Sequence, residues 1–268
     1  MNKTGPWKLT EKLSGGTDVQ IQATTDPRWV VKVSKRYDAA TELSTILRFW
    51  GNPPRHSVHI PHDLGSLFGH GTDEIWYAMR RYDGHLEVDD FTRQHWLQVG
   101  NHCLEFLQDL HLKHGLLHMD IKSTNILVNR SATQFVVADY ETVARPNGTT
   151  PANESRDYRW YHLRFGAVPD QPVYSWRYDL TALGYLLADL TWPDGEPPWN
   201  YRGECDGRRG SGYVSVFTDA DVILLRDEAF TKAHPTVRAY LDAVATLPWD
   251  ARDPPPATFY EQLLALFH

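Results

Sequence analysis

The first eighty residues show mainly the pattern of β-strands. Apolar and polar residues alternate in VQIQA (19–23), which is the period-two pattern of a half-buried strand. The β-rich runs WVVKV (29–33) and IWYAM (75–79) predict two further strands. Between them, residues 38–50 change to apolar positions three or four apart, which predicts one helix. This part of the chain therefore predicts a small sheet with one helix inserted.

The remainder of the chain has mostly helical spacing. Apolar residues three or four apart predict helices at residues 91–114, 178–191, 219–229, 234–246 and 256–267. Short apolar runs predict strands at 126–128 and 135–138, and stretches rich in Pro and Gly predict loops at 145–175 and 193–212. With a hinge near residues 80–84, we expect an α+β fold with a β-rich part at 1–81 and a helical part at 82–268.

Composition narrows the class of protein. The chain has 268 residues, of which 41% are hydrophobic, so it can bury a substantial core. A net charge of −7 argues against a dedicated nucleic-acid binder. No run approaches the ~20 apolar residues of a membrane span, and two cysteines do not make a disulfide scaffold. We expect an intracellular monomer, cytoplasmic or nuclear, without a nucleic-acid or membrane partner.

Candidate chemistry lies in the stretch LLHMDIKSTNILVN, residues 116–129. Asp120, on a loop between a helix and a strand, can accept the proton of an attacking hydroxyl. Lys122 can neutralise charge on a transferred phosphoryl group, and Asn125 offers a neutral oxygen that suits a hard divalent cation. Asp139, at the end of the next strand, could coordinate the same Mg²⁺. These residues predict a site that handles phosphate and metal.

Several motifs of the chain are similar to those of protein kinases. HMDIKSTN resembles the kinase catalytic loop H-x-D-x-K-x-x-N, and DYE at 139–141 stands where kinases carry D-F-G. WVVKV resembles the strand that carries the nucleotide-binding lysine, here Lys32. RYDLTALGYLLADL (177–190) is similar to the buried helix after the activation segment, with Asp179 as its anchoring acid. The chain resembles a eukaryotic-type protein kinase domain, most closely the casein-kinase-one and vaccinia-related kinase group, which implies a bilobal fold.

The resemblance implies that ATP and Mg²⁺ are cofactors. Lys32 would hold the α- and β-phosphates, and Glu42 would hold Lys32. Gly16 would belong to the loop that covers the phosphates, and Met79 would stand at the gatekeeper position before the hinge.

The same resemblance assigns the catalytic and metal-binding residues. Asp120 would orient the hydroxyl of a protein substrate as the catalytic base, and Lys122 would contact the γ-phosphate. Asn125 and Asp139 would hold Mg²⁺. Because Lys122 comes two residues after Asp120, the arrangement is that of Ser/Thr kinases.

Three positions depart from the kinase pattern. Only Gly16 keeps its place in the glycine-rich loop, Glu141 replaces the glycine of D-F-G, and Met119 replaces the arginine before the catalytic aspartate. Besides an active Ser/Thr protein kinase, these departures leave two alternatives open. One is a catalytically impaired pseudokinase that acts as a binding or scaffold module. The other is a small-molecule phosphotransferase of the aminoglycoside or choline kinase type, in which an acid often follows the aromatic of the second motif.

Overall fold

The contacts of the chain divide it into two compact units. The computed structural model describes residues 6–15, 19–70, 74–146, 175–192, 231–248, 251 and 253–268. Unit 1 consists of Met1–Leu86 and Thr124–Val143, and unit 2 of Glu87–Ser123 and Ala144–His268. Residues 124–143 therefore group with the N-terminal part of the chain. The boundary expected between residues 81 and 82 stays a prediction.

Unit 1 contains a five-stranded antiparallel sheet with strand order β1-β2-β3-β5-β4. The strands are β1 (Leu9–Gly15), β2 (Val19–Thr24), β3 (Trp29–Lys35), β4 (Phe68–His70) and β5 (Glu74–Arg80). Their β-branched and aromatic residues suit a pleated, half-buried surface. The strands predicted at 19–23, 29–33 and 75–79 are confirmed as β2, β3 and β5.

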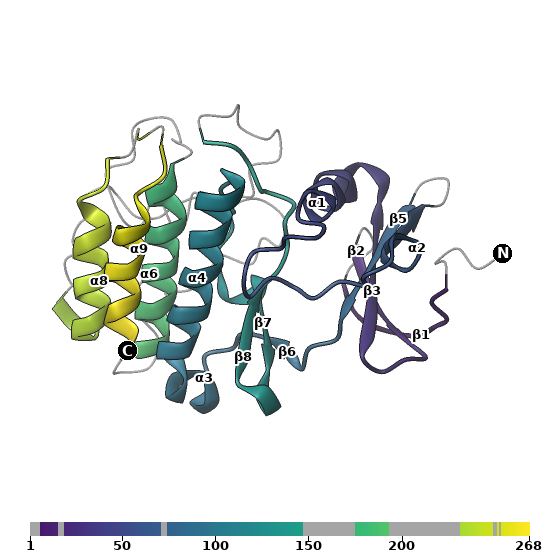
Figure 1. Ribbon diagram of the computed structural model, residues 1–268. Coiled ribbons are helices and arrows are strands. Elements are labelled where there is room, and N and C mark those ends of the chain that lie inside the picture. The colour runs from purple at the N-terminus through teal and green to yellow at the C-terminus, as the bar shows by residue number, and fades with distance from the viewer. Residues whose placement is uncertain are drawn as a thin grey trace, which may run out of the picture. The chain divides into compact units, whose positions relative to one another are not determined.

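The register of β3 and β5 decides which side chains share a face. Lys32 lies directly opposite Tyr77, so the two side chains leave the sheet on the same side. The opposite face is apolar, where Val31, Trp76 and Ala78 form a buried cluster. Helix α1 (Arg36–Arg48) contacts both strands (Figure 1). It corresponds to the helix predicted at 38–50.

A second, three-stranded sheet completes unit 1. Its strands are β6 (Gly84–His85), β7 (Ile126–Asn129) and β8 (Gln134–Val137), paired in that order. β7 and β8 were predicted, whereas β6, at the end of the hinge expected near residues 80–84, was not, and it pairs for two residues only. The short helix α2 (Leu64–Leu67) and strand β4 were not predicted, because three or four residues carry no readable periodicity.

Unit 2 is helical in the part that the structure describes. Its helices are α3 (Asp90–Gln94), α4 (Trp96–His114), α6 (Trp176–Thr191), α8 (Pro235–Ala245) and α9 (Ala257–Leu264), with a 3₁₀ turn at Ala265–Phe267. The helix predicted at 91–114 is two helices, separated at His95. The helix predicted at 219–229, the loop at 193–212 and most of the loop at 145–175 lie outside the described residues.

Helix α6 is the centre of unit 2. It contacts both α4 and α8, and α9 contacts α4 (Figure 1). The approach of α8 depends on Gly184, since a Cβ at this position would collide with the side chain of Leu241. α4 ends at Gly115, whose backbone is left-handed with φ 63°, a conformation that glycine adopts without strain.

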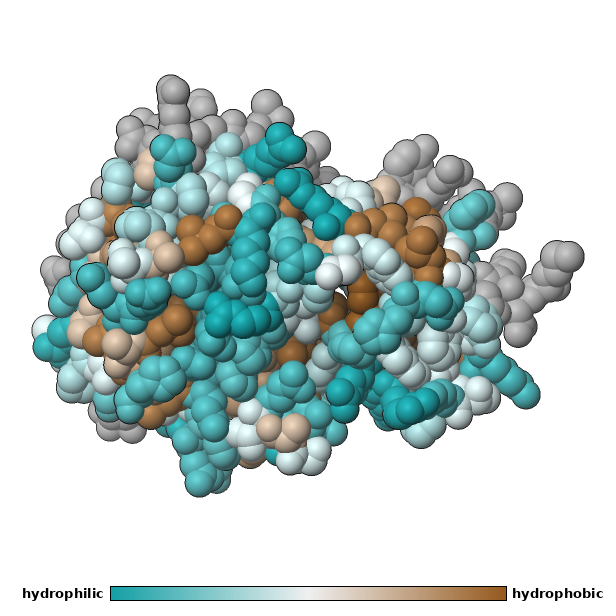
Figure 2. All heavy atoms as spheres, in the orientation of Figure 1, coloured by the Kyte–Doolittle hydropathy of each residue, from teal (hydrophilic) through white to brown (hydrophobic). Residues whose placement is uncertain are grey.

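The surface mixes polar and apolar side chains. On the face shown in Figure 2, hydrophilic and hydrophobic residues are interspersed. Within the described ranges, the large hydrophobic residues that are exposed lie on separate parts of the chain: Leu13, Leu64, Val88, Leu97 and Leu112. None of the helices described here has the length and apolar character needed to cross a membrane.

Candidate active site

A buried ion pair joins the sheet of unit 1 to its helix. Lys32 Nζ of β3 lies 2.7 Å from Glu42 Oε2 of α1. The Lys32 side chain is 9% exposed and that of Glu42 is 0% exposed. The strand brings the lysine inside because apolar neighbours on both sides of it bury the strand. A charged pair held away from water in this way has a fixed geometry, which suits a binding or catalytic role.

The second oxygen of Glu42 is held by two other donors. The Tyr77 hydroxyl donates to Glu42 Oε1 at 2.8 Å, and the backbone N–H of Tyr140 donates to the same oxygen at 3.3 Å. Each carboxylate oxygen therefore has its own partners, with Oε2 facing Lys32. This satisfies a buried carboxylate, which otherwise costs several kcal/mol.

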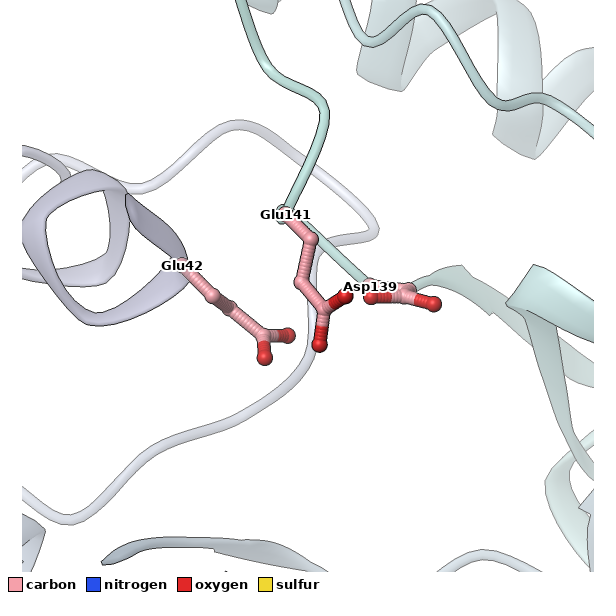
Figure 3. A group of neighbouring side chains, drawn as sticks. All are labelled: Glu42, Asp139 and Glu141. Carbon is pink, nitrogen blue, oxygen red and sulfur yellow. The ribbon is translucent and has the colours of Figure 1, made fainter. Parts of the chain in front are cut away.

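Two further carboxylates approach Lys32 from the segment after β8. Lys32 Nζ lies 3.5 Å from Asp139 Oδ1 and 3.2 Å from Glu141 Oε1. Carboxylate oxygens of Glu42, Asp139 and Glu141 lie within 4.8 Å of one another, and Figure 3 shows the three groups pointing toward a common region. Asp139 has a left-handed backbone with φ 65°, which is strained for a residue with a side chain. Strain of this kind is concentrated at functional sites.

The charges of this cluster shift one another's pKa. Burial by itself lowers the pKa of the Lys32 ammonium, but Glu42, Asp139 and Glu141 outweigh it and raise that pKa. Lys32 is thus cationic at every physiological pH. Burial raises the pKa of Glu141 above its ordinary value, and the nearby Lys32 only partly opposes the shift. The folded protein therefore disfavours the charged form of the Glu141 side chain.

Tyr140 fixes the backbone between the two incoming carboxylates. Its buried hydroxyl donates to the carbonyl of Val137 at 2.9 Å and accepts from the N–H of Val58 at 3.2 Å. Its ring packs edge-on against Phe49, with centroids 5.5 Å apart. A residue held at the ring, the hydroxyl and the N–H leaves its neighbours Asp139 and Glu141 little freedom of backbone position.

The predicted catalytic pair lies in unit 2. Lys122 Nζ lies 3.0 Å from Asp120 Oδ2. The loop that carries the pair is anchored by Asp179 of α6. The fully buried Asp179 carboxylate accepts from the N–H of His118 at 2.7 Å and from the N–H of Met119 at 2.8 Å. The two residues before Asp120 are thereby tied to α6, which is largely buried.

Met119 shows why the loop needs an anchor. Its backbone is left-handed with φ 67°, an unfavourable conformation for a methionine. Its side chain lies in a buried apolar cluster with Leu117, Trp176 and Tyr178. The hydrogen bond to Asp179 and this packing together offset the backbone strain. An apolar contact thus occupies the position where the kinase pattern has arginine.

A second layer of polar residues holds Asp179 itself. His111 Nε2 of α4 lies 3.0 Å from Asp179 Oδ2, and His111 Nδ1 lies 2.6 Å from the hydroxyl of Tyr260 of α9. Both His111 and Tyr260 are buried. Three helices therefore meet in one polar network beneath the loop.

The other predicted site residues are placed as follows. Asn125 ends the 3₁₀ turn Ser123–Asn125, is buried, and accepts the N–H of Ala138 at its backbone carbonyl at 2.8 Å. It belongs to unit 1, as Asp139 does. Met79 is buried on β5 opposite Val30. Gly16 lies outside the described residues.

Sequence reasoning did not identify Tyr77, His111 or Tyr260 as parts of these networks. A weak signal existed for Tyr77, because a buried tyrosine in an apolar strand needs a partner for its hydroxyl. The identity of that partner depends on the register of β5 against β3.

No protein-family model and no curated protein matches the chain. Among solved structures, the chain is similar to the Cydia pomonella granulovirus kinase PK-1, with a TM-score of 0.65 and 16% sequence identity. The match covers 96% of this chain and 92% of the viral one. At this identity the similarity concerns the fold, and the casein-kinase-one and vaccinia-related subgroup stays a prediction. The predicted α+β architecture is confirmed, and the chain has a protein-kinase-like fold.

Proposed function

We propose that the protein is an ATP-dependent kinase that transfers the γ-phosphate to a serine or threonine hydroxyl of a protein substrate. One observation carries the proposal. The buried Lys32–Glu42 pair is formed at 2.7 Å, with Asp139 at 3.5 Å from the same ammonium. In the kinase pattern these are the groups that hold the phosphates and the metal, and here they meet on a protein-kinase-like fold.

The residues of unit 1 suit Mg²⁺ and a nucleotide phosphate. One ammonium faces three carboxylates, so the cluster has an excess of negative charge and of the oxygen donors that Mg²⁺ prefers. The Asp139 side chain is 36% exposed and can accept a further ligand. Asp139 and Asn125 would hold the metal. When bound, Mg²⁺ would neutralise and orient the phosphates.

Lys32 supplies the fixed positive charge of the site. Because its pKa is raised, it does not lose its proton when a phosphate approaches. Glu42 keeps the ammonium at one place and is itself held by Tyr77 and Tyr140. A charge positioned in advance costs no reorganisation during the reaction.

The residues of unit 2 would act on the substrate hydroxyl. Asp120 would orient this hydroxyl and accept its proton, and Lys122, 3.0 Å from Asp120, would neutralise charge on the transferred group. Asp179 holds the backbone before Asp120. The chain's own contribution is thus positioning and charge, which is most of what phosphoryl transfer requires.

A binding module without catalysis is the second candidate. The observation that favours it is the ion pair of Glu141 with Lys32, because this carboxylate occupies an N–H of the ammonium that a phosphate would use. No contact among the described residues favours the small-molecule phosphotransferase.

The test is transfer of radiolabelled γ-phosphate from Mg-ATP to casein, to a basic protein and to a panel of small alcohols. Lys32→Ala and Asp120→Asn are compared with Asp242→Asn, a change of an exposed residue on α8. We expect protein phosphorylation that both site variants lose and the control keeps.

Three results would overturn the proposal. Transfer that persists in both site variants would mean that another protein carries the activity. Nucleotide binding without transfer to any acceptor would establish the binding module. Transfer to small alcohols alone would establish the small-molecule enzyme.

A further inference from the structure

Tyr77 connects the sheet to the ion pair from a position directly beside Lys32. It is opposite Lys32 in the register of β3 and β5, and both side chains leave the same face. The Tyr77 side chain is buried and its hydroxyl lies 2.8 Å from Glu42 Oε1. Lys32, Tyr77 and Glu42 therefore form a closed set across two strands and one helix.

Three carboxylates lie close enough to the Lys32 ammonium to form an ion pair with it. Glu42 is at 2.7 Å, Glu141 at 3.2 Å and Asp139 at 3.5 Å. Glu42 is fully buried, whereas Glu141 is 34% exposed and remains hydrated in part. A buried carboxylate stays in place only when its other lone pairs are satisfied. Lys32 therefore stays closest to Glu42 only as long as other hydrogen-bond donors keep the Glu42 carboxylate in place.

The hydroxyl of Tyr77 is the side-chain donor that the structure gives to Glu42 besides Lys32. The remaining donor, the N–H of Tyr140, is longer at 3.3 Å. If the hydroxyl is removed, Glu42 Oε1 keeps only this weaker contact of the two. The carboxylate is then held less firmly beside Lys32, and the ammonium can pair with Glu141 and Asp139 instead.

We propose that Tyr77 is a positioning residue of the phosphate site: it holds Glu42 so that Lys32 pairs with Glu42 and not with Asp139 or Glu141. The proposal rests on the proposed kinase function. Tyr77 keeps Asp139 available to a metal and limits the competition from Glu141, so it compensates for the carboxylate that replaces glycine in the D-F-G position.

The experiment compares Tyr77→Phe, Glu141→Gln and the double variant. Tyr240→Phe is the matched control, because Tyr240 is also a buried tyrosine, and its hydroxyl donates to the Leu180 carbonyl at 3.0 Å in unit 2. Tyr77→Phe should raise KM for Mg-ATP about tenfold, the factor for loss of a hydrogen bond to a charged group. KM for the protein substrate should stay unchanged. The double variant should recover most of the loss, because Glu141 no longer attracts Lys32.

A second readout does not need transfer. The rate at which trace acetic anhydride acetylates Lys32, relative to the exposed Lys113, reports the surroundings of the amine by mass spectrometry. We expect this relative rate to rise several-fold in Tyr77→Phe, because Glu42 no longer holds the ammonium in place. Tyr240→Phe should leave it unchanged.

The outcomes separate the two proposals. If the wild type transfers no phosphate but the acetylation rates follow the expected order, the kinase function fails and the positioning role of Tyr77 stands. If Tyr77→Phe leaves both KM and the acetylation rate unchanged, the positioning role is overturned. It is also overturned if the loss is not recovered in the double variant and equals that of Tyr240→Phe, because Tyr77 would then contribute only to stability.

Discussion

Lys32 is the residue at which charge and burial oppose each other most strongly. Burial disfavours the ammonium and three carboxylates favour it. The pair with Glu42 contributes less to net stability than its distance suggests, because two charges had to be removed from water. Removing one partner of the pair destabilises the fold strongly, because the charge of the other partner then remains buried and uncompensated.

Lys32→Met should therefore destabilise the fold. Glu42, which is fully buried, would lose its cation, and we expect the free energy of unfolding to fall by about 3 kcal/mol. Urea unfolding followed by fluorescence measures the change. Arg28→Ala is the control, because the Arg28–Asp26 pair lies at the same distance of 2.7 Å but the arginine is 78% exposed. Equal midpoints for the two variants would contradict this account.

Glu141 should give the fold a pH-dependent stability. Its pKa is raised in the folded state, so the folded protein holds this proton in a range of pH where the unfolded chain has released it. The stability is present below the ordinary value of 4.5 and is lost as the pH rises through the raised pKa. Glu141→Gln should thus stabilise the protein at neutral pH and have little effect near pH 4.5. Unfolding free energies of both proteins across this range provide the test, and a difference that does not change with pH would count against it.

Individual site residues could be predicted from the sequence where they belong to a recognisable motif. Lys32, Glu42 and Asp139 were expected together, and the structure brings them within hydrogen-bonding reach of one ammonium. The contact of Glu141 with Lys32 was not predicted, because the sequence does not say whether an added carboxylate turns toward a lysine or toward solvent. Tyr77 was missed for a similar reason, since its role depends on strand register.

At the scale of elements, α6 connects the loop that carries Asp120 to the core of unit 2. Asp179 lies in the first turn of this helix and accepts two backbone N–H groups of this loop. His111 of α4 contacts Asp179, and Tyr260 of α9 contacts His111 in turn. Loop geometry is thus determined by helix packing, and not by the loop's own sequence alone.

Asp179→Ala should weaken both stability and transfer. It leaves two N–H groups of a buried loop without their acceptor, which we expect to cost about 3 kcal/mol in unfolding free energy. Met119 would lose the contact that offsets its strained backbone. Denaturant unfolding and phosphate transfer measure the two effects, with the exposed Asp242→Ala on α8 as control. Full transfer activity in Asp179→Ala would refute the anchoring role.

The elements show where the hydrophobic pattern stops being informative. The break between α3 and α4 was missed, because apolar residues continue in helical phase across His95. The capping box of Asp89 and Thr92 marks where α3 begins, whereas His95, at the start of α4, makes no side-chain cap hydrogen bond that would mark the break. β6 was not predicted, because two residues cannot show alternation and the strand is defined by its pairing with β7.

At the scale of the whole molecule, the net charge of −7 acts on charged binding partners before they make contact. Long-range attraction raises the association rate of oppositely charged partners and is screened by salt. Segment order, by contrast, does not show that residues 124–143 return to unit 1. In that grouping β7 pairs with the much earlier strand β6, and β8 pairs with β7, which no local pattern encodes.

If the protein phosphorylates proteins, basic substrates should be favoured at low ionic strength. We expect kcat/KM for a basic protein to fall several-fold when the salt concentration rises from about 0.05 M to about 0.3 M, where the Debye length is shorter. A neutral peptide with the same acceptor serves as control and should change little. An equal response of both substrates would show that net charge does not steer binding.

The apolar surroundings of Met119 have a consequence for temperature. Where an arginine would hold this loop through charge, the cluster of Leu117, Trp176 and Tyr178 holds it through burial of apolar surface. Burial of that kind weakens on cooling and does not depend on a charged partner. The packing of Met119 should therefore loosen on cooling, which leaves its hydrogen bond to Asp179 as the remaining restraint on this part of the loop.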